Sequence, residues 1–328
     1  MTLLIVVHHH LDLWNVPAWF GQRLAQDFPQ VQIAQRNTYD GVEQDLRDAE
    51  ILFTISLRAD QFAAAQNLRW IHAPTAAVHQ FLFPELVNSE VVLTNSREVH
   101  GPVVAEHVMA LIFALARKIP QAAQLQQKRV WGQEAIWSEG AHPREIAGAT
   151  LGLIGVGSIG ARVAQMASAL GMRVIAVREH IERGNPEGVE AVFPPSEIDD
   201  LLKQSDFVVL AAPLIASTQA LINAARLAAM KRESFLINVG RGAQVDENAL
   251  ADALRNRRLA GAALDVFEHE PLPPDSPLWS LENLLITPHT AGLTEKLWDR
   301  HYELLSDNLR RYLNKQTLRF IVDKRIGY

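Results

Sequence analysis

The sequence predicts an α/β protein with two doubly wound parallel sheets, each in a domain of its own. Three observations lead to this prediction. Short apolar runs alternate with amphipathic segments along nearly the whole chain, as in parallel strands joined by helices. A glycine-rich turn opens the second half of this alternation. The length of 328 residues is sufficient for two hydrophobic cores.

The composition excludes several classes of function. A net charge of −6 gives no basic surface for nucleic acid. Because the chain has no cysteine, disulfides, thiolate catalysis and zinc–sulfur sites are excluded. The longest apolar run, residues 108–116, is too short to span a membrane, and the N-terminal segment lacks the features of a signal peptide. We therefore expect a cytoplasmic protein that binds neither nucleic acid nor a membrane.

The first hundred residues predict one α/β unit. Its buried parallel strands are expected at residues 3–7, 31–34, 51–54, 68–72 and 91–94, with helices at 19–27 and 42–49. Ala76 and Ala77 follow the fourth strand, at the edge where ligands bind in open α/β sheets. Their backbone N–H groups either hold a substrate carboxylate or belong to a simple connection. The tract from His8 to His10 follows the first strand, where neighbouring side chains point to opposite faces, so we expect no metal site.

A long helix, residues 102–117, is expected to connect this unit to the glycine-rich turn. Its apolar residues recur on one face, and a proline lies in its first turn. Within this helix, His107 is expected to be a partly buried packing residue rather than a catalytic one. Residues 118–146 are polar and contain Trp131 and Trp137. This pattern favours an excursion over the surface, with docking on another subunit as one role.

The glycine-rich turn carries the strongest functional signal. The motif Gly155-x-Gly157-x-x-Gly160 lies between a buried strand and an amphipathic helix, and a second strand, residues 174–177, comes next. Gly155 permits the tight turn, Gly157 lets the backbone approach a pyrophosphate, and Gly160 lets the helix pack against the strand. The helix N-terminus supplies N–H groups and partial positive charge for this anion. The arrangement predicts a Rossmann domain that binds a dinucleotide.

The residue at the end of the second strand bears on the choice of coenzyme. A carboxylate at this point would accept hydrogen bonds from the ribose 2′-hydroxyl of NAD, but the sequence has Arg178, with Arg183 further on. A guanidinium can bind a 2′-phosphate through two parallel hydrogen bonds. Glu179 is an alternative ribose ligand, and a solvated loop role for Arg178 is the other interpretation. We expect NADP to be preferred, with NAD as the alternative.

The alternation continues towards the C-terminus and sets the domain boundaries. Further strands are expected at residues 207–212, 235–239, 260–266 and 284–287, and helices at 245–259 and 298–314. The tail, residues 318–322, is expected to rejoin the first unit. The Rossmann domain, residues 101–292, is then an insertion in a flavodoxin-like substrate domain made of residues 1–100 and 293–328.

Four residues that follow strands of the Rossmann domain have the chemistry that hydride transfer to a keto acid requires. Arg241 can bind the carboxylate and polarise the carbonyl. His289 can donate a proton to the carbonyl oxygen, and Glu270 can orient the imidazole and favour its protonated form. Asp265 can hold the carboxamide of the coenzyme or have a structural role. The other three also have a plainer interpretation, as turn or loop residues.

Several motifs resemble the signatures of the D-isomer-specific 2-hydroxyacid dehydrogenases. These are Asn238-Val239-Gly240-Arg241-Gly242, the segment from Gly261 to Pro273, and Thr287-Pro288-His289. The resemblance extends over nearly the whole chain. It implies a homodimeric oxidoreductase that acts on a small 2-keto or 2-hydroxy acid, with Arg241, Glu270 and His289 as catalytic residues and Asp265 as the carboxamide ligand.

The expected binding residues follow from the same motifs. The coenzyme site is expected to be lined by Gly155, Gly157, Ser158, Ile159, Gly160, Arg178, Ala211, Pro213, Thr218, Val239, Gly240, Asp265, His289 and Gly292. The substrate is expected to contact Ala76, Ala77, Arg241 and His289.

Two departures from the family pattern refine the expected function. The family usually has Asp where this chain has Arg178, and in this respect the chain is similar to NADP-preferring glyoxylate and hydroxypyruvate reductases. The family usually has glycine where this chain has Ala76 and Ala77, which leaves the loop shape and the substrate size open. We therefore expect an NADPH-dependent reductase of a small 2-keto acid. The alternative is an NAD(H)-sensing binding protein that resembles the C-terminal binding protein corepressors, which have the same fold.

Overall fold

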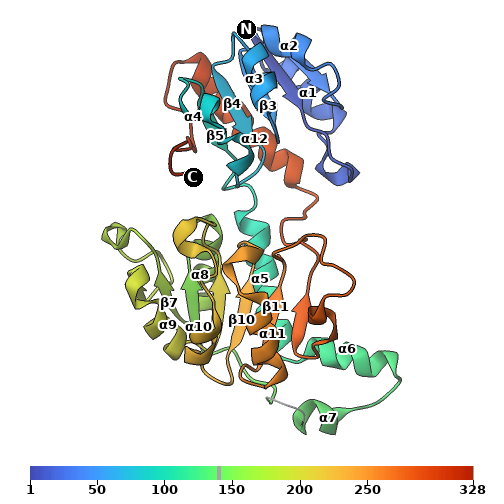
Figure 1. The fold of residues 1–328 in the computed structure, drawn as a ribbon, viewed down its shortest axis with the longest axis vertical. Helices are drawn as coiled ribbons and strands as arrows, with labels where there is room; N and C mark the ends of the chain where they lie inside the picture. Colours follow the sequence, from blue (N-terminus) through green and yellow to red (C-terminus); the bar gives the residue numbers. More distant parts are fainter. Residues whose placement is uncertain (139–141, 328) are drawn as a thin grey trace. The chain divides into compact units, whose positions relative to one another are not determined.

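The computed structural model describes residues 1–138 and 142–327. The chain forms two compact units, each with its own parallel sheet (Figure 1). Unit 1 comprises Met1–His100 and Thr294–Tyr328, and unit 2 comprises Gly101–Leu293. Unit 2 is therefore an insertion in unit 1. The expected boundaries, 1–100, 101–292 and 293–328, differ from these units by one residue at the second junction.

Unit 1 contains a five-stranded parallel sheet in the order β2-β1-β3-β4-β5. The C-terminal tail returns to the edge of this sheet. The Val322 N–H donates to the Leu93 carbonyl at 2.8 Å, and the Asn95 N–H donates to the Phe320 carbonyl at 3.1 Å, so the tail covers the open edge of β5. The elements are β1 (Thr2–Val6), α1 (Ala18–Asp27), β2 (Gln32–Arg36), α2 (Glu43–Asp48), β3 (Ile51–Thr54), α3 (Ala59–Ala64), β4 (Trp70–Ala73), α4 (Pro84–Val87), β5 (Val92–Asn95) and α12 (Leu297–Leu313).

Unit 2 contains a seven-stranded parallel sheet in the order β12-β11-β10-β9-β6-β7-β8. The chain enters the middle of the sheet at β6, runs outward to β8, and crosses back to β9 before it reaches β12. This doubly wound order confirms the predicted fold class and places the switch point between β6 and β9. The strands are β6 (Thr150–Ile154), β7 (Arg173–Val177), β8 (Ala191–Phe193), β9 (Phe207–Leu210), β10 (Phe235–Asn238), β11 (Gly261–Leu264) and β12 (Leu284–Ile286).

Helices cover both faces of the unit 2 sheet. The helices are α5 (Gly101–Ala116), α6 (Ile119–Gln127), α7 (Gln133–Ser138), α8 (Ser158–Ala169), α9 (Ile198–Gln204), α10 (Ala224–Ala229) and α11 (Glu247–Arg255). On one face, Val108 of α5 and Val163 of α8 share a core with Leu151. On the other face, Leu201 of α9 shares a core with Val208. Strands buried on both faces need apolar residues throughout, which explains the continuous apolar runs in the sequence.

In three parts of unit 2 the structure contains elements that the sequence does not predict. Residues 118–146, expected as a surface excursion, contain the two helices α6 and α7, which project away from the sheet (Figure 1). Residues 139–141 of this segment lie outside the described part. Strand β8 is not predicted by the sequence because its three residues are only partly buried at the sheet edge. The helices α9 and α10 are also not predicted, because seven and six residues are too few to show a helical period.

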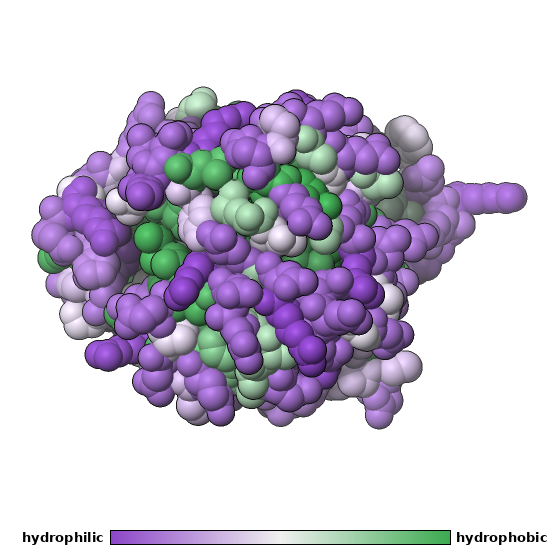
Figure 2. All heavy atoms as spheres, turned by 90° about the horizontal axis from the view of Figure 1, so that it is seen from above, coloured by the Kyte–Doolittle hydropathy of each residue, from purple (hydrophilic) through white to green (hydrophobic). Residues whose placement is uncertain are grey.

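The described residues show no feature of a membrane-spanning protein chain in their helices. No helix among them is long and apolar enough to cross a membrane. The face drawn in Figure 2 is mainly hydrophilic, and its hydrophobic residues lie in small groups between polar ones. Among the exposed apolar side chains of the described part, Trp131, between α6 and α7, is the most accessible at 89 %.

Candidate active site

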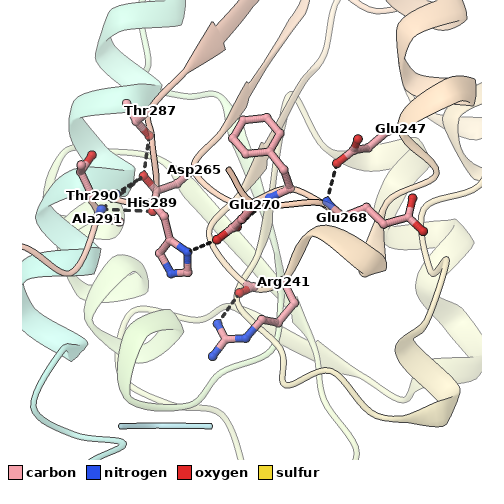
Figure 3. Close-up of polar contacts among 11 residues, drawn as sticks. Arg241, Glu247, Asp265, Glu268, Glu270, Thr287, His289, Thr290 and Ala291 are labelled. Atoms are coloured by element: carbon pink, nitrogen blue, oxygen red, sulfur yellow. Dashed lines mark hydrogen bonds and ion pairs between the residues drawn. The ribbon is translucent and has the colours of Figure 1, made fainter. Parts of the chain in front are cut away.

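The carboxyl edge of the unit 2 sheet brings together the polar residues that the sequence analysis selects. Arg241 follows β10, Asp265 and then Glu270 follow β11, and His289 follows β12. Because these three strands are neighbours and run in parallel, their carboxyl ends lie side by side. Figure 3 shows the guanidinium of Arg241 and the imidazole of His289 both beside the carboxylate of Glu270. All four residues belong to unit 2.

His289 and Glu270 form the central pair of this site. The His289 Nδ1 atom lies 2.6 Å from Glu270 Oε2, while Glu270 Oε1 accepts the Phe267 N–H at 2.9 Å. The hydrogen bond to Glu270 raises the pKa of His289, although burial opposes the increase. Burial tends to raise the pKa of Glu270, but the hydrogen bonds from His289 and Phe267 and the nearby positive charges together lower it. The geometry therefore favours an imidazolium paired with a carboxylate.

Arg241 lies in a tight turn that packs directly against the loop carrying Glu270. Its Nη1 donates to the Gly240 carbonyl at 2.7 Å, and its pKa is lowered by burial but supported by the charge of Glu270. A guanidinium remains a cation at neutral pH. A Cβ atom at Gly242 would lie 1.8 Å from the carbonyl carbon of Phe267. Only glycine permits this approach, which holds the Arg241 turn against the Glu270 loop.

Asp265 organises the loop that carries His289. The residue is 1 % exposed, and its carboxylate accepts hydrogen bonds from the Thr287 hydroxyl at 2.6 Å, the Thr290 N–H at 2.9 Å and the Ala291 N–H at 3.1 Å (Figure 3). The Asp265 carbonyl also accepts the His289 N–H at 2.9 Å. The structural role considered for Asp265 is therefore present in the geometry, and its role as a carboxamide ligand stays a prediction.

Three supporting residues are missed by the sequence analysis. Gln244 is fully buried, accepts the Arg241 N–H at 3.0 Å and donates to the Ala212 and Pro213 carbonyls at 3.3 Å. Glu247 accepts the Glu268 N–H at 2.7 Å, and burial raises its pKa (Figure 3). Thr287 appears only as part of a motif. Gln244 and Glu247 lie close to Arg241 in the sequence, but only their hydrogen bonds reveal what they support.

The glycine-rich turn lies at the switch point of the same sheet and fits a dinucleotide phosphate. Gly155 has a φ of +97°, and a Cβ atom there would lie 2.7 Å from the Ala212 nitrogen. A Cβ atom at Gly160 would lie 2.1 Å from the Gly155 carbonyl oxygen. At exposed Gly157 it would meet nothing within 4 Å, and no side chain caps the N-terminus of α8 there. The start of α8 therefore remains accessible to an anion.

The other expected coenzyme residues extend along this edge from β12 to β7. Arg178 follows β7, and its Nη2 donates to the Gly184 carbonyl at 2.5 Å. Its Nε atom is buried and has no partner among the described residues. Thr218 closes the loop after β9 by donating to the Pro213 carbonyl at 2.8 Å. Ser158 and Ile159 begin α8, and Gly292 lies in the loop after β12. Directly after β9 and β10 come Ala211, Val239 and Gly240.

The two residues expected to contact the substrate carboxylate, Ala76 and Ala77, lie in unit 1 after β4. The Asn95 Nδ2 donates to the Ala76 carbonyl at 2.8 Å, and the Thr75 hydroxyl donates to the Ala77 carbonyl at 2.6 Å. These bonds order the loop within unit 1. Its contribution to substrate binding stays a prediction.

Comparison with known proteins places this site in context. Residues 109–291 match the sequence family described as D-isomer specific 2-hydroxyacid dehydrogenase, NAD binding domain. The chain is 36 % identical over 266 residues to a glyoxylate reductase of Korarchaeum cryptofilum. The aligned region covers 79 % of this chain and 77 % of that protein.

Two solved structures are similar over the whole length. A D-isomer specific 2-hydroxyacid dehydrogenase family protein from Aeromonas salmonicida has a TM-score of 0.84 at 31 % identity, covering 98 % of this chain and 99 % of that one. An NADPH-dependent glyoxylate/hydroxypyruvate reductase from Sinorhizobium meliloti, solved in complex with NADP and sulfate, has a TM-score of 0.82 at 25 % identity, covering 100 % of both chains.

Proposed function

The chain belongs to the family of D-isomer-specific 2-hydroxyacid dehydrogenases, and on this basis we propose that it reduces small 2-keto acids of the glyoxylate and hydroxypyruvate type with NADPH. The observation that carries the proposal is the His289–Glu270 pair, 2.6 Å apart and beside a fixed guanidinium. The names of the relatives from Korarchaeum cryptofilum and Sinorhizobium meliloti support the substrate class.

The proposed mechanism assigns one task to each side chain. The bound coenzyme supplies a hydride to the carbonyl carbon of the keto acid. Arg241 binds the substrate carboxylate and draws electron density from the carbonyl group. His289, bonded to Glu270 through Nδ1, has Nε2 left to donate a proton to the carbonyl oxygen. Glu270 holds the ring in this orientation and stabilises its positive charge until the proton is transferred.

The coenzyme preference depends on Arg178 in this proposal. At the end of β7, Arg178 is in a position to bind the 2′-phosphate that distinguishes NADPH from NADH. We expect the substitution Arg178→Asp to lower kcat/KM for NADPH by roughly tenfold or more, because a charge-assisted contact is replaced by a repulsion. Parallel assays with NADH provide the control. An unchanged ratio between the two coenzymes would contradict this role.

The proposal extends to a homodimer that uses the helices α6 and α7. An open apolar hollow of about 680 Å³ lies between these helices, next to Trp131 and Trp137, which are 89 % and 60 % exposed. Exposed tryptophans around an apolar hollow are typical of protein interfaces. The mass of the protein in solution, measured by light scattering, tests this part.

The direct test is a steady-state assay of the purified protein with NADPH and NADH against a panel of short 2-keto acids. We expect turnover with glyoxylate or hydroxypyruvate. Turnover would also count against a purely nucleotide-sensing role. An absence of turnover with every acid of the panel would refute the proposed function.

A further inference from the structure

His107 contacts two residues next to His289: Thr287, on the same loop, and Asp265, which holds that loop. It lies on α5, the first element of unit 2, and its Nε2 atom is 3.1 Å from the Thr287 hydroxyl oxygen and 3.7 Å from Asp265 Oδ1. Its side chain is 21 % exposed. Thr287 is the first residue after β12, two positions before His289. A helix at the start of unit 2 is therefore bonded to the loop that carries the proposed proton donor.

The direction of these hydrogen bonds follows from the number of hydrogens on each group. The single hydroxyl hydrogen of Thr287 points to Asp265 Oδ1 at 2.6 Å, because an ionised carboxylate can only accept. Towards His107, the Thr287 oxygen must then act as the acceptor. The Nε2 atom of His107 therefore carries a hydrogen, and the bonds run in one direction from His107 through Thr287 to Asp265.

We call this chain of hydrogen bonds from His107 through Thr287 to Asp265 the relay. Asp265, its last member, is bonded to the loop of His289. Its carboxylate accepts the N–H groups of Thr290 and Ala291, and its carbonyl accepts the N–H of His289. His289 has a φ of +53°, a left-handed conformation that a residue other than glycine keeps only when its surroundings hold it. The hydrogen bonds to Asp265 hold the backbone around His289 in this conformation.

We propose that His107 is a positioning residue: through Thr287 and Asp265 it fixes the 287–291 loop so that the imidazole of His289 meets Glu270. The inference rests on the proposed function, because it takes His289 as the proton donor. Among the described residues, the charged groups that face His289 are Glu270, Asp265 and Arg241, and the group that faces His107 is Asp265. A residue that served only packing would be replaceable by an apolar side chain of similar size, whereas the relay requires a donor.

Two matched pairs of variants separate the relay from packing. Thr287→Val keeps the shape of the side chain and removes the hydroxyl, whereas Thr287→Ser keeps the hydroxyl. His107→Leu removes the donor, whereas His107→Gln retains one. We expect kcat of Thr287→Val and of His107→Leu to fall by about five- to tenfold, the net effect of one hydrogen bond. The KM for the coenzyme should change by less than about twofold. The Ser and Gln variants should stay within about threefold of the wild type.

The double variant Thr287→Val/His107→Leu tests whether the two residues act in series. We expect its kcat to be close to that of the worse single variant, because both substitutions break the same chain of bonds. Independent losses that add in free energy would overturn the proposal. The control is Glu106→Gln, which changes an exposed residue on the same turn of α5 and should leave kcat as in the wild type.

A second measurement does not depend on turnover. The imidazole of His289 is titrated by NMR in histidine-labelled protein without coenzyme, and its signal is assigned with His289→Gln. In Thr287→Val and His107→Leu we expect the pKa of His289 to fall towards its ordinary value, because the bond to Glu270 is no longer held, while Thr287→Ser and His107→Gln retain the wild-type pKa. An unchanged titration in both the Val and Leu variants overturns the proposal. If the wild type reduces no keto acid, the proposed function fails, and the titration still reports on the relay.

Discussion

One histidine of each unit, His72 in unit 1 and His289 in unit 2, is held in the opposite way to the other. In unit 1, His72 is completely buried, with its ring nitrogens 2.8 Å from the Thr94 hydroxyl and 3.1 Å from the Ser96 hydroxyl, and it stacks on Phe53. Burial lowers the pKa of His72 to about 3. In unit 2, His289 has a side chain that is 53 % exposed, and its bond to Glu270 raises its pKa.

This difference shows that the surroundings, more than the residue type, decide how a histidine titrates. Burial disfavours the charged form of His72, whose partners are neutral hydroxyls and an aromatic ring. At the edge of the parallel sheet, the carboxylate of Glu270 raises the pKa of His289 and leaves the imidazole accessible, as the proposed role of proton donor requires. Three substitutions in these two regions test whether the two histidines differ in this way.

The largest effect is expected from removal of the exposed imidazole. The substitution His289→Gln keeps a polar side chain but cannot donate a proton at neutral pH, so kcat should fall by about a hundredfold to ten-thousandfold, the range for a general acid. Steady-state kinetics with the preferred keto acid provide the measurement. Turnover close to that of the wild type would remove His289 from the mechanism.

The second effect concerns the buried imidazole and acid stability. Because the pKa of His72 is depressed in the folded state, the unfolded chain binds a proton that the folded chain does not as the pH falls below about 6.5. His72 should therefore destabilise the protein at pH 5 by about 2 kcal/mol relative to pH 7, with the loss continuing towards pH 3. Urea unfolding of the wild type and of His72→Gln at both pH values measures this difference.

An exposed histidine of the same unit provides the control for that experiment. His79 is exposed to solvent, so His79→Gln should retain the pH dependence of the wild type. A stability difference between pH 7 and pH 5 that is the same in His72→Gln as in the wild type would contradict the assignment.

The smallest effect is expected from the partner of His289. The substitution Glu270→Gln removes the negative charge that raises the pKa of the imidazole, so less of it is protonated in neutral and alkaline solution. Reduction should be roughly tenfold slower at pH 8, the value of one charge-assisted hydrogen bond, and should recover as the pH falls. Oxidation, which needs the neutral imidazole, should be less affected. A pH profile identical to that of the exposed control Glu268→Gln would refute the role of Glu270.

Much of the fold could be predicted because it depends on local patterns. Strands that are buried on both faces need continuous apolar runs, and these runs located the buried strands of unit 2. Strand β8 left no such run because it lies at the sheet edge, where three partly buried residues suffice. The segment 118–146 is predicted only as an excursion over the surface, since its polar composition hides the two helices α6 and α7.

The candidate residues could be selected for a related reason. In a parallel sheet all strands end at the same edge, so residues that follow neighbouring strands must meet, and Arg241, Glu270 and His289 each follow such a strand. The sequence predicts a packing role for His107 and gives no sign of its polar contact with Thr287, since the two residues are 180 positions apart. It does not single out Gln244 and Glu247, because a hydrogen bond to a distant or neighbouring backbone N–H leaves no trace in residue type or spacing.

By itself, the sequence determined the two parallel sheets, the glycine turn that fits a dinucleotide phosphate, and the set of ionisable residues at the sheet edge. Only the tertiary structure decided how the loop of His289 is held: Asp265 accepts its N–H groups, and His107 contacts its Thr287 hydroxyl. The physical reason is that strand and turn patterns repeat over a few residues, whereas a pKa or a hydrogen-bond relay depends on the distances between atoms that folding brings together.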